Sequence, residues 1–263
     1  MTAQNNTPKT AVLICNTGSP AAPTKEAVAK YLAEFLGDRR VVEMNPLIWQ
    51  PILRGIIIPR RAQASADRYK TVWTQKGSPL VAVTSDTAQG LQKALGDEYL
   101  VTEEGLSGRT TVFVDPIHES MDALSVIYAL LKSHEVIDLL IIMLGTNDVK
   151  ERFGANAACI AAGMERLILK AKSVDCWGTK QPNILVVAPP PIGAGFHDAV
   201  MGDGCVEKSA GVAGQLRIIC ERQGVHFLDA KDCEFNKVDF MHLTRKGHAQ
   251  LAELLAKEVP GLI

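Results

Sequence analysis

The chain has 263 residues, 47% hydrophobic and 22% charged, a composition that suits a packed core and excludes wholesale disorder. Its formal net charge of -1 lacks the basic excess that nucleic-acid-binding and membrane-surface proteins carry. The most apolar segment, residues 137–144, is much shorter than the ~20 residues of a membrane-spanning helix. We therefore expect neither a nucleic-acid partner nor a membrane.

The cysteines and the first residues indicate the compartment. None of the six cysteines forms a C-x-x-C pair, so the spacing typical of zinc and redox sites is missing. The opening residues, MTAQNNTPKT, are polar and lack the apolar core of a signal peptide. These features predict a cytoplasmic protein with free thiols, no metal and no cofactor. The cysteines are Cys15, Cys159, Cys176, Cys205, Cys220 and Cys233.

The first third of the chain predicts a strand followed by helices. Residues 11–15 form a short apolar strand, and Thr24 can cap a helix that Gly37 ends. Three prolines within residues 41–60 predict irregular structure there, with at most short helical pieces. Further elements complete this part: helices over 62–73 and 86–95, and a strand over 99–102.

The remainder alternates helices and apolar strands more clearly. Residues 137–144 and 184–188 read as central strands buried on both faces. The other predicted elements are a helix around 124–131, helices over 155–172 and 206–223, a strand over 225–228, and a last helix capped by Thr244. This alternation predicts an α/β fold: a three-layer αβα sandwich around a parallel, flavodoxin-like sheet.

Three polar clusters follow predicted strands in this region. Residues 103–111 follow one strand, residues 145–148 follow the central strand, and residues 239–242 precede the last helix. In an open parallel sheet, ligand sites lie beyond the carboxyl ends of the strands. Each cluster alone is typical of a turn or a helix-entry ion pair, but their combination at these positions predicts one site.

The residue types in the clusters suit the hydrolysis of an acyl bond. Asp239 lies three residues before His242 and can hold its imidazole in the orientation that a general base needs. A loop glycine, of which residues 103–111 contain two, lets a backbone N–H approach a developing oxyanion, and an Asn side chain at a strand end can donate to the same oxygen.

The strings E-E-G-L-S-G-R-T-T, L-I-I-M-L-G-T-N-D, V-V-A-P-P-P and D-F-M-H-L-T resemble the SGNH, or GDSL-type, hydrolases over residues 98–263. The resemblance is to their arylesterase or acyltransferase-like branch and implies a small-molecule ester substrate. It implies oxyanion donors at Gly108 and Asn147, an orienting carboxylate at Asp239 and a base at His242. Asp148 is then expected to make structural hydrogen bonds, and His248 to pack on its helix.

The front of the chain departs from that family, because no G-D-S nucleophile motif is present. Residues 9–97 instead resemble the N-terminal part of ferrochelatase, through V-L-I-C-N-T-G-S-P-A-A-P-T-K-E-A-V, Y-L-A-E-F-L-G-D-R-R-V-V-E, I-L-R-G-I-I-I-P and Y-K-T-V-W-T-Q-K-G-S-P-L. That family's catalytic residues lie in later parts that this chain lacks. We expect a hybrid of segments 1–97 and 98–263 that forms one continuous α/β domain.

Ser19 is the candidate nucleophile, because Ile14 to Ser19 can be laid over the hydrolase strand and its G-D-S. Pro20 counts against it by favouring an extended backbone at Ser19. Ser107 is a weaker candidate in the oxyanion loop.

Three functions stay open at this point. The first is an ester hydrolase, impaired if the missing motif matters. The second is a tetrapyrrole- or iron-binding protein, and the third is a folded but inactive hybrid. The apolar residues Trp49, Ile52 and 56–58 either cover the core or form a homo-oligomer interface.

Overall fold

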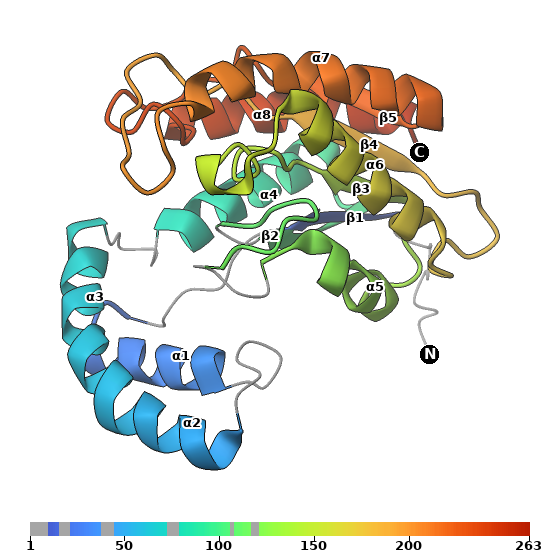
Figure 1. The fold of residues 1–263 in the computed structure, drawn as a ribbon. Coiled ribbons are helices and arrows are strands. Elements are labelled where there is room, and N and C mark those ends of the chain that lie inside the picture. The colour runs from blue at the N-terminus through green and yellow to red at the C-terminus, as the bar shows by residue number, and fades with distance from the viewer. Residues whose placement is uncertain (1–9, 16–21, 38–44, 73–78, 106–107, 117–120) are drawn as a thin grey trace, which may run out of the picture.

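The computed structural model describes residues 10–15, 22–37, 45–72, 79–105, 108–116 and 121–263 (Figure 1). Within these ranges, five parallel strands form one sheet in the order β2-β1-β3-β4-β5. This is the predicted flavodoxin-like order. The strands are β1 (Thr10–Cys15), β2 (Tyr99–Gly105), β3 (Leu139–Ile142), β4 (Ile184–Ala188) and β5 (His226–Asp229).

Helices cover both faces of the sheet and confirm the three-layer sandwich. Side chains of β3 alternate between the faces, as the pleat of a strand requires. Leu140 and Ile142 pack with the helices of one face, whereas Leu139 and Ile141 pack with those of the other. The first face carries α5 (Ala123–Ser133), α6 (Ala157–Lys172) and α7 (Cys205–Gln223), and the second carries α4 (Pro79–Leu95) and α8 (Arg245–Glu258).

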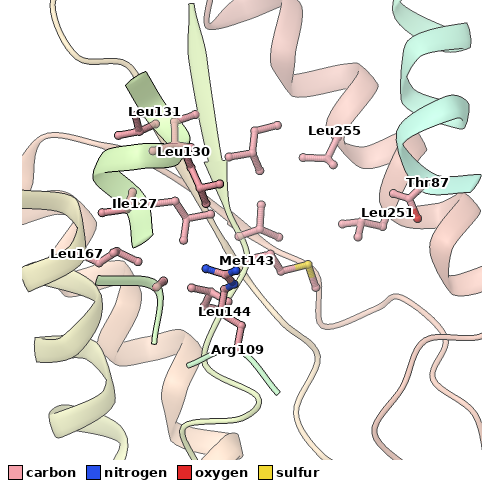
Figure 2. A pocket seen from close by; sticks show the side chains of 15 residues that line it. Thr87, Arg109, Ile127, Leu130, Leu131, Met143, Leu144, Leu167, Leu251 and Leu255 are labelled. Carbon is pink, nitrogen blue, oxygen red and sulfur yellow. The ribbon is translucent and has the colours of Figure 1, made fainter. Parts of the chain in front are cut away.

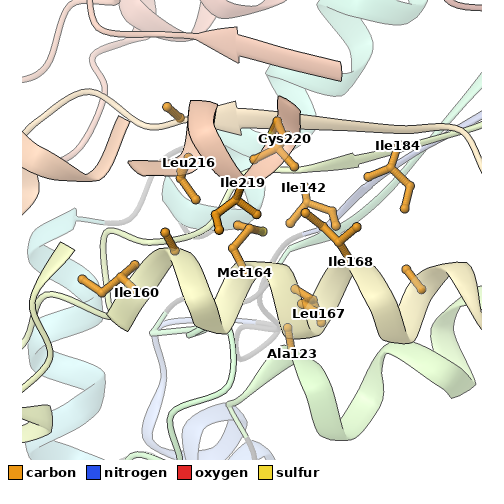
Figure 3. Packing of buried hydrophobic residues seen from close by; sticks show 14 of the residues in the cluster. Ala123, Ile142, Ile160, Met164, Leu167, Ile168, Ile184, Leu216, Ile219 and Cys220 are labelled. Carbon is orange, nitrogen blue, oxygen red and sulfur yellow. The ribbon is translucent and has the colours of Figure 1, made fainter. Parts of the chain in front are cut away.

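The larger core lies between the sheet and the α5–α7 layer. Ile142 and Ile184 of the strands face Met164 and Ile168 of α6 (Figure 3). Leu216 of α7 belongs to the same cluster and is fully buried. Burial of side chains this large contributes about 1.5–3 kcal/mol each, so this layer holds the sheet that carries the three clusters.

The ferrochelatase-like front contributes to the sheet and to the hydrophobic cluster on its other face. Strand β1 pairs with both β2 and β3, so it is an interior strand of the sheet. Leu91 of α4 is fully buried in one cluster with Leu251 and Leu255 of α8. The two segments of the chain therefore share a sheet and a hydrophobic cluster.

Residues 45–60 correct the prediction of irregular structure. They form α2 (Pro46–Ile52), a π-helical turn (Leu53–Ile57) and the start of α3 (Ile58–Val72) without a break. Asn45 caps α2 by accepting from the Leu47 N–H at 3.0 Å, and Pro46 stands in the first turn, where no N–H is needed. The wider π turn, in which the Ile58 N–H reaches the Leu53 carbonyl, ends at Ile57, two residues before Pro59.

The front helices form a small cluster of their own. Val28 of α1 (Lys25–Gly37) packs with Ala62 and Ala66 of α3, and all three side chains are fully buried. Leu47 and Ile48 of α2, in contrast, are 85% and 56% exposed.

Two strands differ in length from their predictions. Strand β2 runs past residue 102 to Gly105, because β1 continues to pair with it as far as Cys15. Strand β3 covers only Leu139–Ile142 of the predicted 137–144. Short 3-10 turns complete the described elements at Glu151–Phe153 and Val259–Gly261.

Among the described helices, none combines the length and the apolar character needed to cross a bilayer. All cysteines with described side chains are free thiols: Cys159 is exposed, and Cys176, Cys205, Cys220 and Cys233 are buried.

Candidate active site

The three predicted clusters leave the sheet at one edge. Gly108 follows β2, Asn147 follows β3, and the segment Asp239–His242 follows β5. Because all strands are parallel, the loops after their carboxyl ends rise from the same side of the sheet.

Hydrogen bonds tie these loops to one another. The Thr111 N–H of the first loop donates to the Asp148 carboxylate of the second at 2.9 Å. The Glu151 N–H of the second donates to the Met201 carbonyl of the loop after β4 at 2.8 Å. The loop after β4 also contacts the histidine segment, because the Gly193 N–H donates to the Phe240 carbonyl at 2.8 Å.

Asp239 and His242 form the carboxylate–imidazole pair that the sequence predicted. One oxygen of Asp239 lies 2.9 Å from the ring Nδ1 of His242, and the other accepts the His242 backbone N–H at 2.9 Å. In the described part of the chain, the ring Nε2 has no hydrogen-bond partner. The His242 side chain is 57% exposed, so this nitrogen is accessible to a substrate or a nucleophile.

Asn236 shapes the loop that carries the pair. Its side-chain oxygen accepts from the backbone N–H of Val238 and of Asp239, at 2.9 and 2.8 Å. The backbone N–H of Asn236 donates to the His242 carbonyl at 2.8 Å. Two residues later, Thr244 caps α8 by accepting from the Gly247 N–H at 3.0 Å. The histidine is thus held between an Asx turn and a helix start.

Opposing effects act on the carboxyl group of Asp239. Partial burial raises its pKa, but the hydrogen bonds from His242, Asn236 and Met241 outweigh burial and lower it from its usual value. Asp239 is therefore ionised at neutral pH and can hold an imidazole in one tautomer.

Gly108 and Asn147, the predicted oxyanion donors, lie in backbone turns that fix their direction. Gly108 has a φ of 80°, a conformation that side-chain-bearing residues seldom adopt. Asn147 lies in a turn closed by the Asp148 N–H, which donates to the Gly145 carbonyl at 3.1 Å. The Asn147 side chain is half-buried, whereas Asp148, Val149 and Lys150 after it are buried.

Asp148 makes the structural hydrogen bonds that were expected of it. Its Oδ1 accepts both the backbone N–H and the hydroxyl of Thr111, at 2.9 and 2.5 Å. Burial raises the pKa of Asp148 to about 6, although the hydrogen bonds from Thr111 and the charge of Lys150 act in the opposite direction.

A buried ion cluster supports the same loops and was missed from the sequence. Asp115 is fully buried and pairs with Lys150 at 2.9 Å and with Arg152 at 2.9 Å. Arg152 also donates to the Val200 carbonyl at 2.8 Å, which reaches the loop after β4. The three charges lie far apart in sequence and form no local motif, so only the fold reveals the cluster.

Two hollows lie near these loops. An apolar cavity of about 80 Å³ lies in the core, and Figure 2 shows Arg109 beside Leu144 among the residues that line it. An open groove of about 610 Å³ lies between residues 193–195 and the segment after β5, and Phe240 forms part of its wall.

The remaining expectations from the sequence concern the nucleophile, His248 and metal binding. Ser19 and Ser107 are outside the described residues, so the identity of the nucleophile stays a prediction. His248 lies at the contact of α8 with α4, where its ring Nδ1 is 2.7 Å from the Thr87 hydroxyl. Within the described ranges, no three His, Cys, Asp or Glu side chains come together in a way that could hold a metal ion.

Comparison with known proteins agrees with the arrangement of these loops. The family model described as GDSL-like lipase/acylhydrolase matches residues 74–250, more than half of the chain. The chain belongs to this family.

Solved structures of GDSL-type esterases have the same fold. The aryl esterase of M. smegmatis is 32% identical, with a TM-score of 0.65 over 73% of this chain and 93% of that one. A carbohydrate acetylesterase from Sinorhizobium meliloti is 26% identical, with a TM-score of 0.68 over 97% of this chain and 100% of that one.

The front of the chain has a different relationship. Residues 9–108 match the ferrochelatase family model and overlap the GDSL match. The ferrochelatase of Xanthomonas axonopodis pv. citri is 52% identical over 93 residues, which are 35% of this chain and 29% of that protein. The chain thus spans less than a third of the length of this relative. The predicted combination of a ferrochelatase-like front with a GDSL-type hydrolase is confirmed.

Proposed function

We propose that this chain hydrolyses small acyl esters with a Ser-His-Asp triad on the GDSL-type scaffold. His242 is the general base and Asp239 orients it. Gly108 and Asn147 donate to the oxyanion, and Ser19 is the nucleophile. The chain binds a small-molecule ester and needs neither a metal nor a cofactor for this chemistry.

One observation carries the proposal. The His242 ring is held by Asp239 through Nδ1, and its Nε2 is left without a partner among the described residues at the edge where Gly108 and Asn147 also lie. A general base needs this arrangement, because the orienting carboxylate occupies one ring nitrogen and the other accepts the proton of the nucleophile.

The reaction proceeds in two stages. The Ser19 hydroxyl attacks the ester carbonyl carbon while its proton passes to His242 Nε2, and the Gly108 and Asn147 N–H groups bind the resulting oxyanion. His242 then gives the proton to the leaving alcohol, and an acyl-serine remains. Water, activated by the same histidine, releases the acid and restores the hydroxyl.

The related structures favour a small acyl group. One is named an aryl esterase and another a carbohydrate acetylesterase. An aryl acetate combines the features of both names, so p-nitrophenyl acetate is a suitable first substrate.

The proposal is tested by comparing wild type with His242→Ala and Ser19→Ala on that substrate. His197→Ala is a matched control, because His197 also has its ring Nδ1 on a carboxylate, that of Asp203 at 2.8 Å, but is not part of the proposed triad. We expect His242→Ala to remove most turnover and His197→Ala to leave it unchanged. Loss of turnover in His197→Ala alone would indicate that His197, and not His242, is the catalytic histidine. Unchanged turnover in Ser19→Ala would remove only the assignment of Ser19 as the nucleophile.

A second candidate function rests on the front of the chain. Its 52% identity to a ferrochelatase over 93 residues favours tetrapyrrole binding, although the chain spans only 29% of that protein. Titration with protoporphyrin distinguishes the two: a shift of the Soret band at micromolar porphyrin supports binding, and an unchanged band removes this candidate. The inactive hybrid predicts neither turnover nor labelling by a fluorophosphonate probe.

A further inference from the structure

Asp148 is buried in a way that is unfavourable for folding. Its side chain has 0% exposure, and Oδ1 accepts both hydrogen bonds from Thr111. The other oxygen, Oδ2, is buried too and has no hydrogen-bond partner among the described residues. A buried carboxylate with an unsatisfied oxygen costs folding free energy, so its presence calls for a reason other than stability.

The partners of Asp148 lead to both proposed oxyanion donors. Asp148 directly follows Asn147, and its N–H closes the Asn147 turn on the Gly145 carbonyl at 3.1 Å. Thr111 lies three residues after Gly108. The carboxylate therefore joins the loop that carries one donor to the loop that carries the other.

Neighbouring groups hold the ends of these two loops in place. Asp115 and Lys150 join the same two loops by a second buried contact of 2.9 Å, farther along the chain from both donors. Helix α6 packs closely on Thr111, since a Cβ placed on Gly163 would lie 2.6 Å from the Thr111 hydroxyl. The Asp148–Thr111 contact thus joins the two loops close to both donors, between described segments that these neighbours also hold.

We propose that Asp148 is a positioning residue for ester hydrolysis: by holding Thr111, it sets the Gly108 N–H at the separation from Asn147 that lets both bind the oxyanion. The inference rests on the proposed function. Asp148 itself is enclosed and does not contact the substrate. Oxyanion donors act through preorganised geometry, and a misplacement of about 1 Å is enough to cost ~10²-fold in rate.

The exchange of Asp148 for Asn separates positioning from a simple structural role. Burial raises the pKa of Asp148 to about 6, so at pH ~8 the carboxyl is ionised in spite of its surroundings. Asn keeps the size and one acceptor oxygen, and it removes the buried charge. A charged acceptor forms shorter and stronger hydrogen bonds than an amide, so Thr111 is held less firmly in the variant. Stability is then kept or gained while turnover falls.

The experiment compares kcat, KM and the urea midpoint of wild type, Asp148→Asn, Thr111→Val and Asp122→Ala, with p-nitrophenyl acetate at pH ~8. Asp122 is the matched control: its carboxylate is also buried and near Thr110, but it caps α5 through the Ser125 N–H at 2.9 Å and does not reach Thr111. For Asp148→Asn we expect kcat to fall about 10- to 100-fold, KM to stay within about twofold, and the midpoint not to fall.

Thr111→Val and Asp122→Ala show whether the loss of turnover is specific to the Asp148–Thr111 contact. Thr111→Val loses one of the two hydrogen bonds, and we expect a smaller fall in kcat, about three- to tenfold. Asp122→Ala should lower the urea midpoint and leave kcat unchanged.

A kcat of Asp148→Asn within twofold of wild type would overturn the inference and leave the esterase proposal standing. If that variant does not fold, an unchanged kcat in Thr111→Val has the same consequence. A folded wild-type protein without turnover would instead remove the proposed function, and this inference with it.

Discussion

Asp239 holds His242 at two points, with one carboxylate oxygen on the backbone N–H and the other 2.9 Å from the ring Nδ1. This double contact fixes both where the histidine lies and how its ring is turned. The ring nitrogen that remains, Nε2, is accessible, since the side chain is 57% exposed.

Asp239→Asn tests the orienting role. The amide can still accept the backbone N–H, but it no longer favours the tautomer with a proton on Nδ1. We expect kcat for p-nitrophenyl acetate to fall about 100-fold or more. Asp203→Asn, which alters the exposed pair with His197, is the control and should retain wild-type turnover. Equal activity of Asp239→Asn and wild type would contradict the orienting role.

Asp115→Ala tests the buried ion cluster. The change leaves Lys150, with a side chain 4% exposed, and Arg152, 15% exposed, without their shared carboxylate. Breaking a buried pair from one side costs about 3–5 kcal/mol, measured as the free energy of unfolding in urea. Glu165→Ala breaks a bidentate contact with Arg222 at the surface, and its cost should stay near or below ~1 kcal/mol. Similar losses in both variants would show that the cluster is not buried as described.

Gly163→Ala and Gly214→Ala test the packing of α6 against the Thr111 segment. A Cβ at Gly163 would lie 2.6 Å from the Thr111 hydroxyl and 2.9 Å from Val112, whereas a Cβ at Gly214 in α7 meets nothing within 4 Å. We expect Gly163→Ala to lower the free energy of unfolding by about 1–3 kcal/mol through overpacking. Gly214→Ala should raise it by about 0.5–1 kcal/mol, because alanine favours helix. Stabilisation by both changes would contradict the close contact.

The pH dependence of stability tests the burial of Asp148. Its pKa is raised from 3.8 to about 6 on folding, so the folded protein binds this proton more tightly than the unfolded chain. The stability that this group contributes is therefore fully present below pH ~4 and is lost as pH rises through about 6.

A shift of this size corresponds to about 3 kcal/mol. We expect the unfolding free energy of wild type, minus that of Asp148→Asn, to fall by about that amount between pH ~4 and pH ~8. The subtraction removes groups that titrate in both proteins. A difference that stays constant with pH would show that Asp148 is not buried.

Much of the fold followed from apolar periodicity alone. The runs that became β4 and β3 are buried on both faces, and such runs are recognisable in the sequence because no polar residue interrupts their centres. Residues 45–60 were not predictable in the same way. Their prolines argue against a helix, but Pro46 stands in a first turn and a π turn precedes Pro59.

The site was predictable where its members are neighbours in sequence. Asp239 and His242 lie three residues apart, and a local turn alone brings them together. The contacts of Asp115 with Lys150 and of Thr111 with Asp148 join residues more than 30 positions apart. These contacts depend on the order of β2 and β3 in the folded sheet, and no local pattern specifies them.

The most direct test of the account is the rate of p-nitrophenyl acetate hydrolysis by folded wild type and by His242→Ala at pH ~8. A triad enzyme that loses its base loses several orders of magnitude in kcat, so we expect a fall of at least about 10³-fold. Hydrolysis by His242→Ala at the wild-type rate would contradict the central claim that this imidazole is the base.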